Sequence, residues 1–184
     1  MAANPVTRSL SLAGLAAIVV GVGLYVFGTQ HTPDYTTSLF GQTGPDTFDL
    51  KSWLATGVLA FAVVQVALAL WMFGKLPGVH AAPPEVTTAH RVIGAGAILL
   101  SIPIAYHCAF AYGVQTDLDT RVAVHSIAGC FFYGVFVGKV VLVRSPSWRV
   151  PGWAIPLAGG TLAATVAVLW YTSALWYFND FKLP

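Results

Sequence analysis

Residues 121–143 read RVAVHSIAGCFFYGVFVGKVVLV, in which Lys139 is the only charged residue after the first position. An apolar run of this length can cross the ~30 Å hydrocarbon core of a bilayer as an α-helix, which takes about 20 residues. Four further stretches have the same apolar character and a similar length. They cover residues 9–29, 51–75, 87–113 and 152–178. The sequence therefore predicts an all-α integral membrane protein, a helical bundle with five transmembrane helices.

The composition supports this fold class and limits the number of domains. The 184 residues are 57% hydrophobic and 9% charged, whereas charged residues make up about 25% of an ordinary soluble domain. The longest predicted loop, residues 31–49, has room only for a short surface element. We therefore expect a single transmembrane domain over residues 1–184. The net charge of +2 is spread along the membrane edges, which argues against a nucleic-acid partner.

Charge placement predicts the orientation of the chain. If the amino terminus is cytoplasmic, Glu85 is the only acidic residue of the inner segments, and most acidic residues fall outside. The inner bases are then Arg8, Lys75, Arg91, Arg144 and Arg149, and the outer acids are Asp34, Asp46, Asp49, Asp117, Asp119 and Asp180. By the positive-inside rule the amino terminus is cytoplasmic and the carboxyl terminus lies outside. We expect an integral protein of a bacterial plasma membrane.

Two histidines lie inside consecutive apolar segments, at matching distances from the turn between them. His107 comes about six residues before the turn VQTDLDT, and His125 about six residues after it. At 1.5 Å per residue both would lie roughly 9 Å below the same surface. Facing imidazoles at equal depth are the arrangement that ligates a haem iron from both sides. Intramembrane ionisable residues also favour a functional role by default.

The residues on the helix face of His125 fit the same hypothesis. Arg121, His125 and Gly129 are four residues apart, so they share one face. Arg121 would lie where haem propionates emerge and pair with them. Gly129 would leave room for a porphyrin to lie against the helix. The alternative is that both histidines are buried polar residues that bond to backbone carbonyls or to water.

A third histidine, His90, raises the question of a second haem. It lies 17 residues before His107, about 25 Å along the helix and near the inner surface. A second haem would need another ligand there, and His80 in the inner loop is the only other inner histidine. The alternative is that His90 is an interfacial residue at the helix start and that Lys139 extends to the inner surface.

The strings HRVIG, at residues 90–94, and VHSIAG, at residues 124–129, resemble the helices of the cytochrome b561 and ferric-reductase-like haem b proteins. The resemblance covers about residues 86–145. It implies that His107 and His125 ligate one haem b, and it extends to His90. Those families usually hold two haems on four histidines, whereas this chain has no fourth histidine within a span.

Together these features predict a membrane haem b electron-transfer protein with one haem near the outer face, and a second haem left open. It would pass electrons between an outer-face redox protein and quinone or another respiratory-chain subunit. If it is an enzyme, it is an oxidoreductase or an electron-transfer subunit of one. One alternative is a structural subunit of a respiratory complex without its own haem. Another is a transporter or proton relay, for which the candidate residues are His107, His125, Lys139 and Gln65.

Aromatic residues crowd the outer end of the last predicted helix, and they allow two interpretations. They are Trp170, Tyr171, Trp176, Tyr177 and Phe178. One interpretation is a belt at the membrane interface, where Trp and Tyr are enriched. The other is a wall of a cofactor or quinone pocket.

Overall fold

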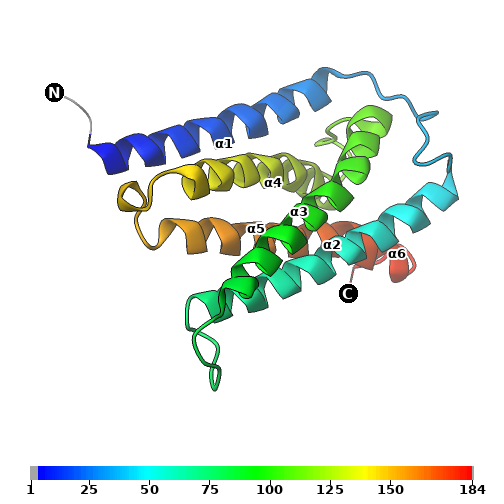
Figure 1. The fold of residues 1–184 in the computed structure, drawn as a ribbon. Helices are drawn as coiled ribbons and strands as arrows, with labels where there is room; N and C mark the ends of the chain where they lie inside the picture. Colours follow the sequence, from blue (N-terminus) through cyan, green and yellow to red (C-terminus); the bar gives the residue numbers. More distant parts are fainter. Residues whose placement is uncertain (1–3, 184) are drawn as a thin grey trace. The chain divides into compact units, whose positions relative to one another are not determined.

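The structure, a computed structural model, describes residues 4–183 and confirms the all-α fold (Figure 1). Within these residues five helical stretches are long and apolar enough to cross a membrane. The long helices are α1 Pro5–Gln30, α2 Pro45–Met72, α3 Pro84–His107, α4 Thr120–Arg144 and α5 Ala154–Trp170. The shorter elements are the π-helices η1 Cys108–Tyr112 and η3 Tyr171–Leu175, the 3₁₀ helix η2 Ser147–Arg149, and α6 Trp176–Phe178.

The helix boundaries differ from the predicted spans by a few residues, and local chemistry explains the differences. Helix α2 begins at Pro45, six residues before the predicted start at residue 51. Gly44 takes a positive φ of 59°, and proline suits the first helical turn because its missing N–H has no partner there anyway. At the start of α4, the Asp119 carboxylate accepts a hydrogen bond from the Val122 N–H at 2.8 Å.

The described residues divide into two compact units. Unit 1 contains the described residues up to Thr32 together with Gly113–Val168, and unit 2 contains Pro33–Tyr112 and the described residues from Leu169 onward. Each unit is built on one pair of long helices, α1 with α4 and α2 with α3. The single transmembrane domain expected for residues 1–184 stays a prediction.

In unit 1, α1 and α4 pack closely because small residues face each other (Figure 1). A Cβ atom added to Gly134 would lie 2.6 Å from the Ala17 carbonyl oxygen, and one added to Gly138 would lie 3.1 Å from that of Ala13. The contacts on each helix are four residues apart, so they form one continuous antiparallel seam. Small residues at this spacing let membrane helices approach until their backbones touch.

In unit 2, α2 and α3 are joined by packing and by a polar contact. A Cβ atom on Gly57 would lie 2.9 Å from the Leu100 side chain. The Gln65 amide donates a hydrogen bond of 2.6 Å to the His90 carbonyl. Polar side chains within membrane spans commonly make such interhelical hydrogen bonds.

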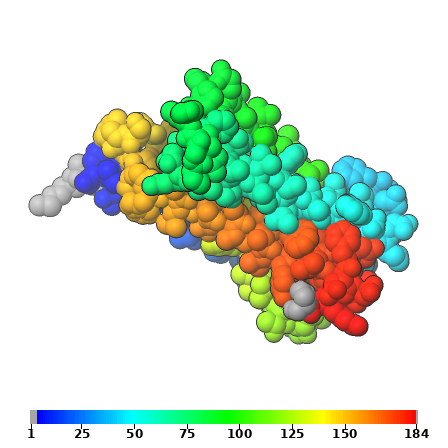
Figure 2. All heavy atoms as spheres, turned by 90° about the horizontal axis from the view of Figure 1, so that it is seen from below, coloured from blue at the N-terminus to red at the C-terminus, as the bar shows by residue number. Residues whose placement is uncertain are grey.

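The carboxyl-terminal part of unit 2 is held against α2. The Trp170 indole donates a 3.0 Å hydrogen bond to the Thr56 hydroxyl. The rings of Trp53 and Phe178 meet edge to face, with centroids 5.2 Å apart. Figure 2 shows α6 and the described residues after it beside the start of α2. These contacts bring the aromatic residues of the chain end to the end of α2 that carries Pro45.

Candidate functional site

His107 is the most enclosed of the predicted site residues. It ends α3 in unit 2, and only 2% of its surface is exposed. Its Nε2 lies 3.0 Å from the Thr37 carbonyl oxygen. Because a carbonyl only accepts hydrogen bonds, Nε2 carries the proton, and a neutral ring then presents a lone pair at Nδ1. Within the described residues that buried Nδ1 has no hydrogen-bond partner.

The loop between α1 and α2 supplies the carbonyl that orients His107. Its Asp34 N–H donates to the Phe110 carbonyl in the π-helix at 3.0 Å. The Asp34 carboxylate accepts from both the backbone N–H and the hydroxyl of Thr36, at 3.0 and 2.6 Å. Leu39, which is 3% exposed, fixes the far side of the loop in the core. The loop therefore closes over the end of α3 and holds Thr37 in place.

The local shape of the backbone changes at His107. Pro103 lies inside α3, where it has no N–H to donate, and the helix becomes a π-helix from Cys108 to Tyr112. Such π-turns are rare and occur frequently at functional sites. The Tyr112 ring at the end of this turn packs edge to face against His107, with centroids 5.6 Å apart.

Lys51 places a cation in the same neighbourhood. Its ammonium lies 4.7 Å from the centroid of the Phe48 ring and 4.5 Å from that of the Tyr112 ring. Both distances are within the range of cation–π attraction. The Tyr112 ring also packs against His107, so Lys51 and His107 contact the same ring. Unit 2 thus gathers an imidazole, an ammonium and aromatic rings at one end.

The other predicted site residues belong to unit 1. His125 is half-buried on α4. Arg121, one turn earlier, lies 3.9 Å from the Asp119 carboxylate, with 20% of the arginine side chain and 55% of the aspartate side chain exposed. A Cβ atom added to Gly129 would meet no atom within 4 Å. The helix face predicted from the sequence is thus present, with open space at Gly129.

The two predicted haem ligands lie in different units of the structure. His107 lies in unit 2 and His125 in unit 1, so each is described within its own unit. Their pairing stays a prediction from the sequence. No group of three or more His, Cys, Asp or Glu side chains that could hold a metal ion occurs among the described residues. A haem iron needs only two axial ligands from the protein, so this finding does not bear on the histidine pair.

His90 and His80, the sequence candidates for ligands of a second haem, both lie in unit 2. His90 lies in the second turn of α3, half-buried, and its carbonyl accepts the Gln65 bond. His80 is exposed in the loop before α3, and its carbonyl accepts a 3.0 Å hydrogen bond from the Trp71 indole. Both contacts use backbone atoms, and a role of either imidazole in a second haem stays a prediction.

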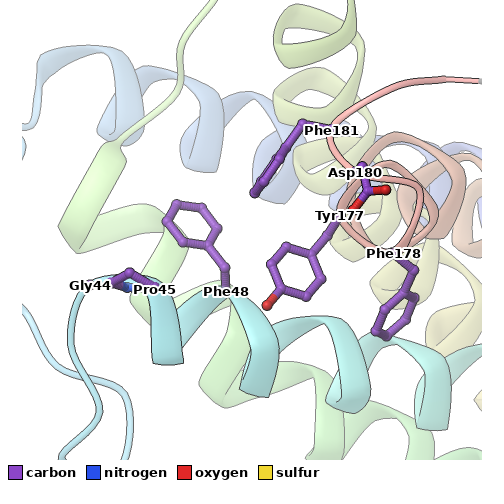
Figure 3. Close-up of a pocket in the computed structure, with 7 residues that line it drawn as sticks. All are labelled: Gly44, Pro45, Phe48, Tyr177, Phe178, Asp180 and Phe181. Atoms are coloured by element: carbon purple, nitrogen blue, oxygen red, sulfur yellow. The ribbon is translucent and has the colours of Figure 1, made fainter.

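A pocket of about 590 Å³ opens beside the chain end in unit 2 (Figure 3). In Figure 3 the rings of Phe48, Tyr177 and Phe181 point toward a common space. The remaining lining residues are Gly44, Pro45, Phe178 and Asp180. Tyr177 and Phe178 belong to the predicted aromatic cluster, whereas Trp170 has the structural hydrogen bond to Thr56.

Sequence reasoning missed Lys51 and Thr37. Phe48 and Lys51 are three residues apart and share a helix face. The sequence did not predict this pair, because the predicted helix began at residue 51 and so excluded Phe48. The contact of Thr37 has no sequence signal at all, because its side chain is not involved and its backbone carbonyl meets a residue 70 positions away.

Comparison with known proteins identifies a family and no characterised relative. No curated protein and no solved structure matches the chain. One family model, described as a family of unknown function (DUF6529), matches residues 10–184, which is nearly the whole chain and includes most of α1 and all of α2 to α5. The chain therefore belongs to the DUF6529 family.

Proposed function

We propose that this protein is a membrane haem b electron-transfer protein in which His107 and His125 are the axial ligands. The pairing rests on the sequence, where the two residues stand at equal distances from one turn. We further propose that the haem lies toward the outer face of a bacterial plasma membrane. The acidic turn with Asp117 and Asp119 would then meet a cationic patch on a soluble redox protein.

The observation that carries the proposal is the hydrogen bonding of His107. Metal-ligating histidines almost always donate their second ring N–H to a carbonyl, a carboxylate or water, which sets the tautomer and the ring orientation. His107 makes this bond to the Thr37 carbonyl, and its buried Nδ1 lone pair has no hydrogen-bond partner among the described residues. A polar atom buried without a partner costs free energy, and an iron at Nδ1 would satisfy it.

The residues around His125 fit a haem as well. The empty space at the missing Cβ of Gly129 leaves room for a flat macrocycle against α4. The 3.9 Å contact between Arg121 and a half-exposed Asp119 is long for an ion pair, and such exposed pairs contribute only about 0–1 kcal/mol. The Arg121 guanidinium, one turn before His125 on α4, is the cation that would pair with a propionate.

The residues described above would bind the haem, orient it and shield it from water. His107 and His125 would hold the haem iron, and a haem held by two histidines would carry electrons rather than bind oxygen. The α1–α2 loop keeps water from the His107 imidazole, since that residue is 2% exposed. When bound, haem b supplies reversible one-electron transfer.

We propose quinone as the membrane-soluble electron partner, bound in the aromatic pocket of unit 2. Its volume of about 590 Å³ lies within the range of about 300–1,000 Å³ common for small-molecule sites. The rings of Phe48, Tyr177 and Phe181 offer faces on which a flat ring can stack. Another respiratory-chain subunit is the alternative partner.

The test is the visible spectrum of the purified full-length protein, with haem per chain measured as the pyridine haemochrome. The wild type should show b-haem bands and one haem per chain. His107→Ala and His125→Ala should each lose most of the haem while keeping their helical content. His31→Ala is the matched control, because that histidine stacks on Phe27 at the end of α1 and has no part in the proposal. It should keep the full spectrum.

Two outcomes would overturn the proposal or part of it. A wild-type protein without b bands, after expression with ample haem, would leave the structural-subunit and transporter functions as the better explanations. An unaltered six-coordinate spectrum in either histidine variant would show that this residue is not a ligand. Two haems per chain would instead assign a ligand role to His90, with His80 as the nearest candidate for its partner.

A further inference from the structure

Unit 1 contains an apolar groove that the proposed electron transfer does not use. It has a volume of about 300 Å³ and is bounded by α1, α4 and α5. Its walls are mostly small or aliphatic side chains, with Phe131 and Trp153 as the aromatic exceptions. The full lining is Leu10, Ala13, Gly14, Ala17, Phe131, Val135, Gly138, Lys139, Leu142, Trp153, Ala154, Leu157, Ala158 and Thr161.

Lys139 is the one charged residue that lines this groove. Its ammonium nitrogen lies 3.7 Å from the position that a Cβ atom on Gly159 would occupy, so the side chain lies against α5. Among residues 4–183 no carboxylate lies within ion-pair distance of it. A charge within a membrane span is costly unless an anion or water accompanies it. The groove therefore combines apolar walls with a cation that lacks a protein counter-ion.

The end of unit 1 nearest Lys139 is positively charged. Arg144 ends α4 five residues later, and Arg149 follows in η2. The Arg149 guanidinium lies 4.3 Å from the centroid of the Trp148 ring, and its buried Nε has no hydrogen-bond partner among the described residues. The sequence from 140 to 155 contains no acidic residue. Basic pockets between membrane helices on the cytoplasmic side bind anionic lipid headgroups.

The groove is also long enough for a lipid chain. Along α4 its lining runs from Phe131 to Leu142, which at 1.5 Å per residue is about 16 Å. This equals about half of the ~30 Å hydrocarbon core, the depth of one leaflet. Lys139 lies three residues from the Leu142 end, so a headgroup there would leave most of the groove for the chain.

We propose that this groove binds an anionic phospholipid, with its phosphate at Lys139 and one acyl chain along α4. The apolar walls disfavour a small soluble anion, since it would lose hydration without gaining polar contacts. The charge of Lys139 favours an anionic over a zwitterionic headgroup. The site lies wholly within unit 1 and does not depend on haem binding, so this proposal and the proposed function can fail separately.

The test uses Trp153, which lines the groove, as a reporter. Full-length protein is reconstituted into phosphatidylcholine vesicles that contain a minor fraction of brominated phosphatidylglycerol or, separately, brominated phosphatidylcholine. The Trp153→Phe variant gives the fluorescence of the other tryptophans, which is subtracted. The brominated anionic lipid should quench Trp153 at a lower mole fraction than the zwitterionic one. Lys139→Gln should reduce this preference about fivefold, the usual effect of one lysine on anionic lipid binding.

Two matched variants separate the site from general surface charge. Lys139→Arg should keep the preference, because the cation remains. Lys75→Gln removes an exposed cation from unit 2 and should change nothing. Equal quenching by both lipids in the wild type, or an unchanged preference in Lys139→Gln, would overturn the proposal. Stronger quenching by brominated oleate than by phosphatidylglycerol would also overturn it and assign the groove to a free fatty acid.

Discussion

At the scale of single residues, the hydrogen bonding of the His107 ring is what makes this residue a candidate ligand. One ring nitrogen donates to the Thr37 carbonyl, and the other is buried with no hydrogen-bond partner in residues 4–183. The sequence allowed two possibilities, a haem ligand or a buried polar residue bonded to a backbone carbonyl. The structure shows the carbonyl bond. It also shows that the hydrogen bond involves only one ring nitrogen. The bond therefore orients the ring, and the lone pair of the second nitrogen can still bind a metal.

Gly129 provides a test that separates cofactor packing from helix packing. A Cβ atom at this position meets no atom within 4 Å among the described residues, so Gly129→Leu should leave the helical content and thermal stability unchanged. If a porphyrin lies against this face, the same variant should bind several-fold less haem. Haemochrome content per chain, measured beside circular dichroism, decides the matter. Gly160→Leu, at another open glycine position, is the control, and a full haem load in Gly129→Leu would argue against haem on this face.

Arg121 should tune the midpoint potential of the bound haem. A nearby cation favours the reduced form, which carries one less positive charge, so Arg121→Ala should lower the potential. Asp119→Asn removes the opposite charge and should raise it, while the asparagine still caps α4 at Val122. Redox titration of both variants measures the two shifts. Unchanged potentials in both would show that Arg121 serves only the turn.

At the scale of secondary-structure elements, the α1–α4 seam depends on small residues that let the two backbones touch. Gly134→Ala would put a methyl group 2.6 Å from the Ala17 carbonyl oxygen. Because the obstacle is backbone, the helices must move apart. We expect a loss of about 1–3 kcal/mol in the free energy of unfolding, the usual range for overpacking.

A matched glycine on the partner helix controls for the effect of alanine itself. Gly23 lies on α1 with nothing within 4 Å of its Cβ position, so Gly23→Ala should be neutral or slightly stabilising. Thermal unfolding in detergent, followed by circular dichroism, compares the two. If Gly134→Ala unfolds at the wild-type temperature, the close approach of α1 and α4 is not what stabilises unit 1.

At the scale of the whole molecule, the charge distribution predicts which loops face the cytoplasm. Cys108 and Cys130 are the only cysteines, so replacing both with alanine gives a background for thiol labelling. In intact bacteria, Ser38→Cys in the α1–α2 loop should react with a membrane-impermeant maleimide. Ser147→Cys in η2 should react only after the membrane is permeabilised. The reverse pattern would invert the orientation and move the proposed haem to the cytoplasmic side.

The amino-acid sequence was enough to predict the fold class and the approximate bounds of the five apolar helices. The predicted span at residues 9–29 corresponds to Pro5–Gln30, and the one at 121–143 to Thr120–Arg144. This agreement has a physical reason. A backbone in hydrocarbon must satisfy its hydrogen bonds within one segment, so an apolar run of sufficient length has few alternatives to a helix.

The pairing of the helices and the contacts of the candidate residues could be learned only from the three-dimensional structure. Small residues occur on several spans, so their pattern could not identify α4 as the partner of α1. That choice depends on which backbones fit together at van der Waals distance. The bond from His107 to Thr37 and the position of Lys51 between two rings likewise join residues far apart in the chain. The local sequence does not predict such contacts, because they form only when a loop folds onto packed helices.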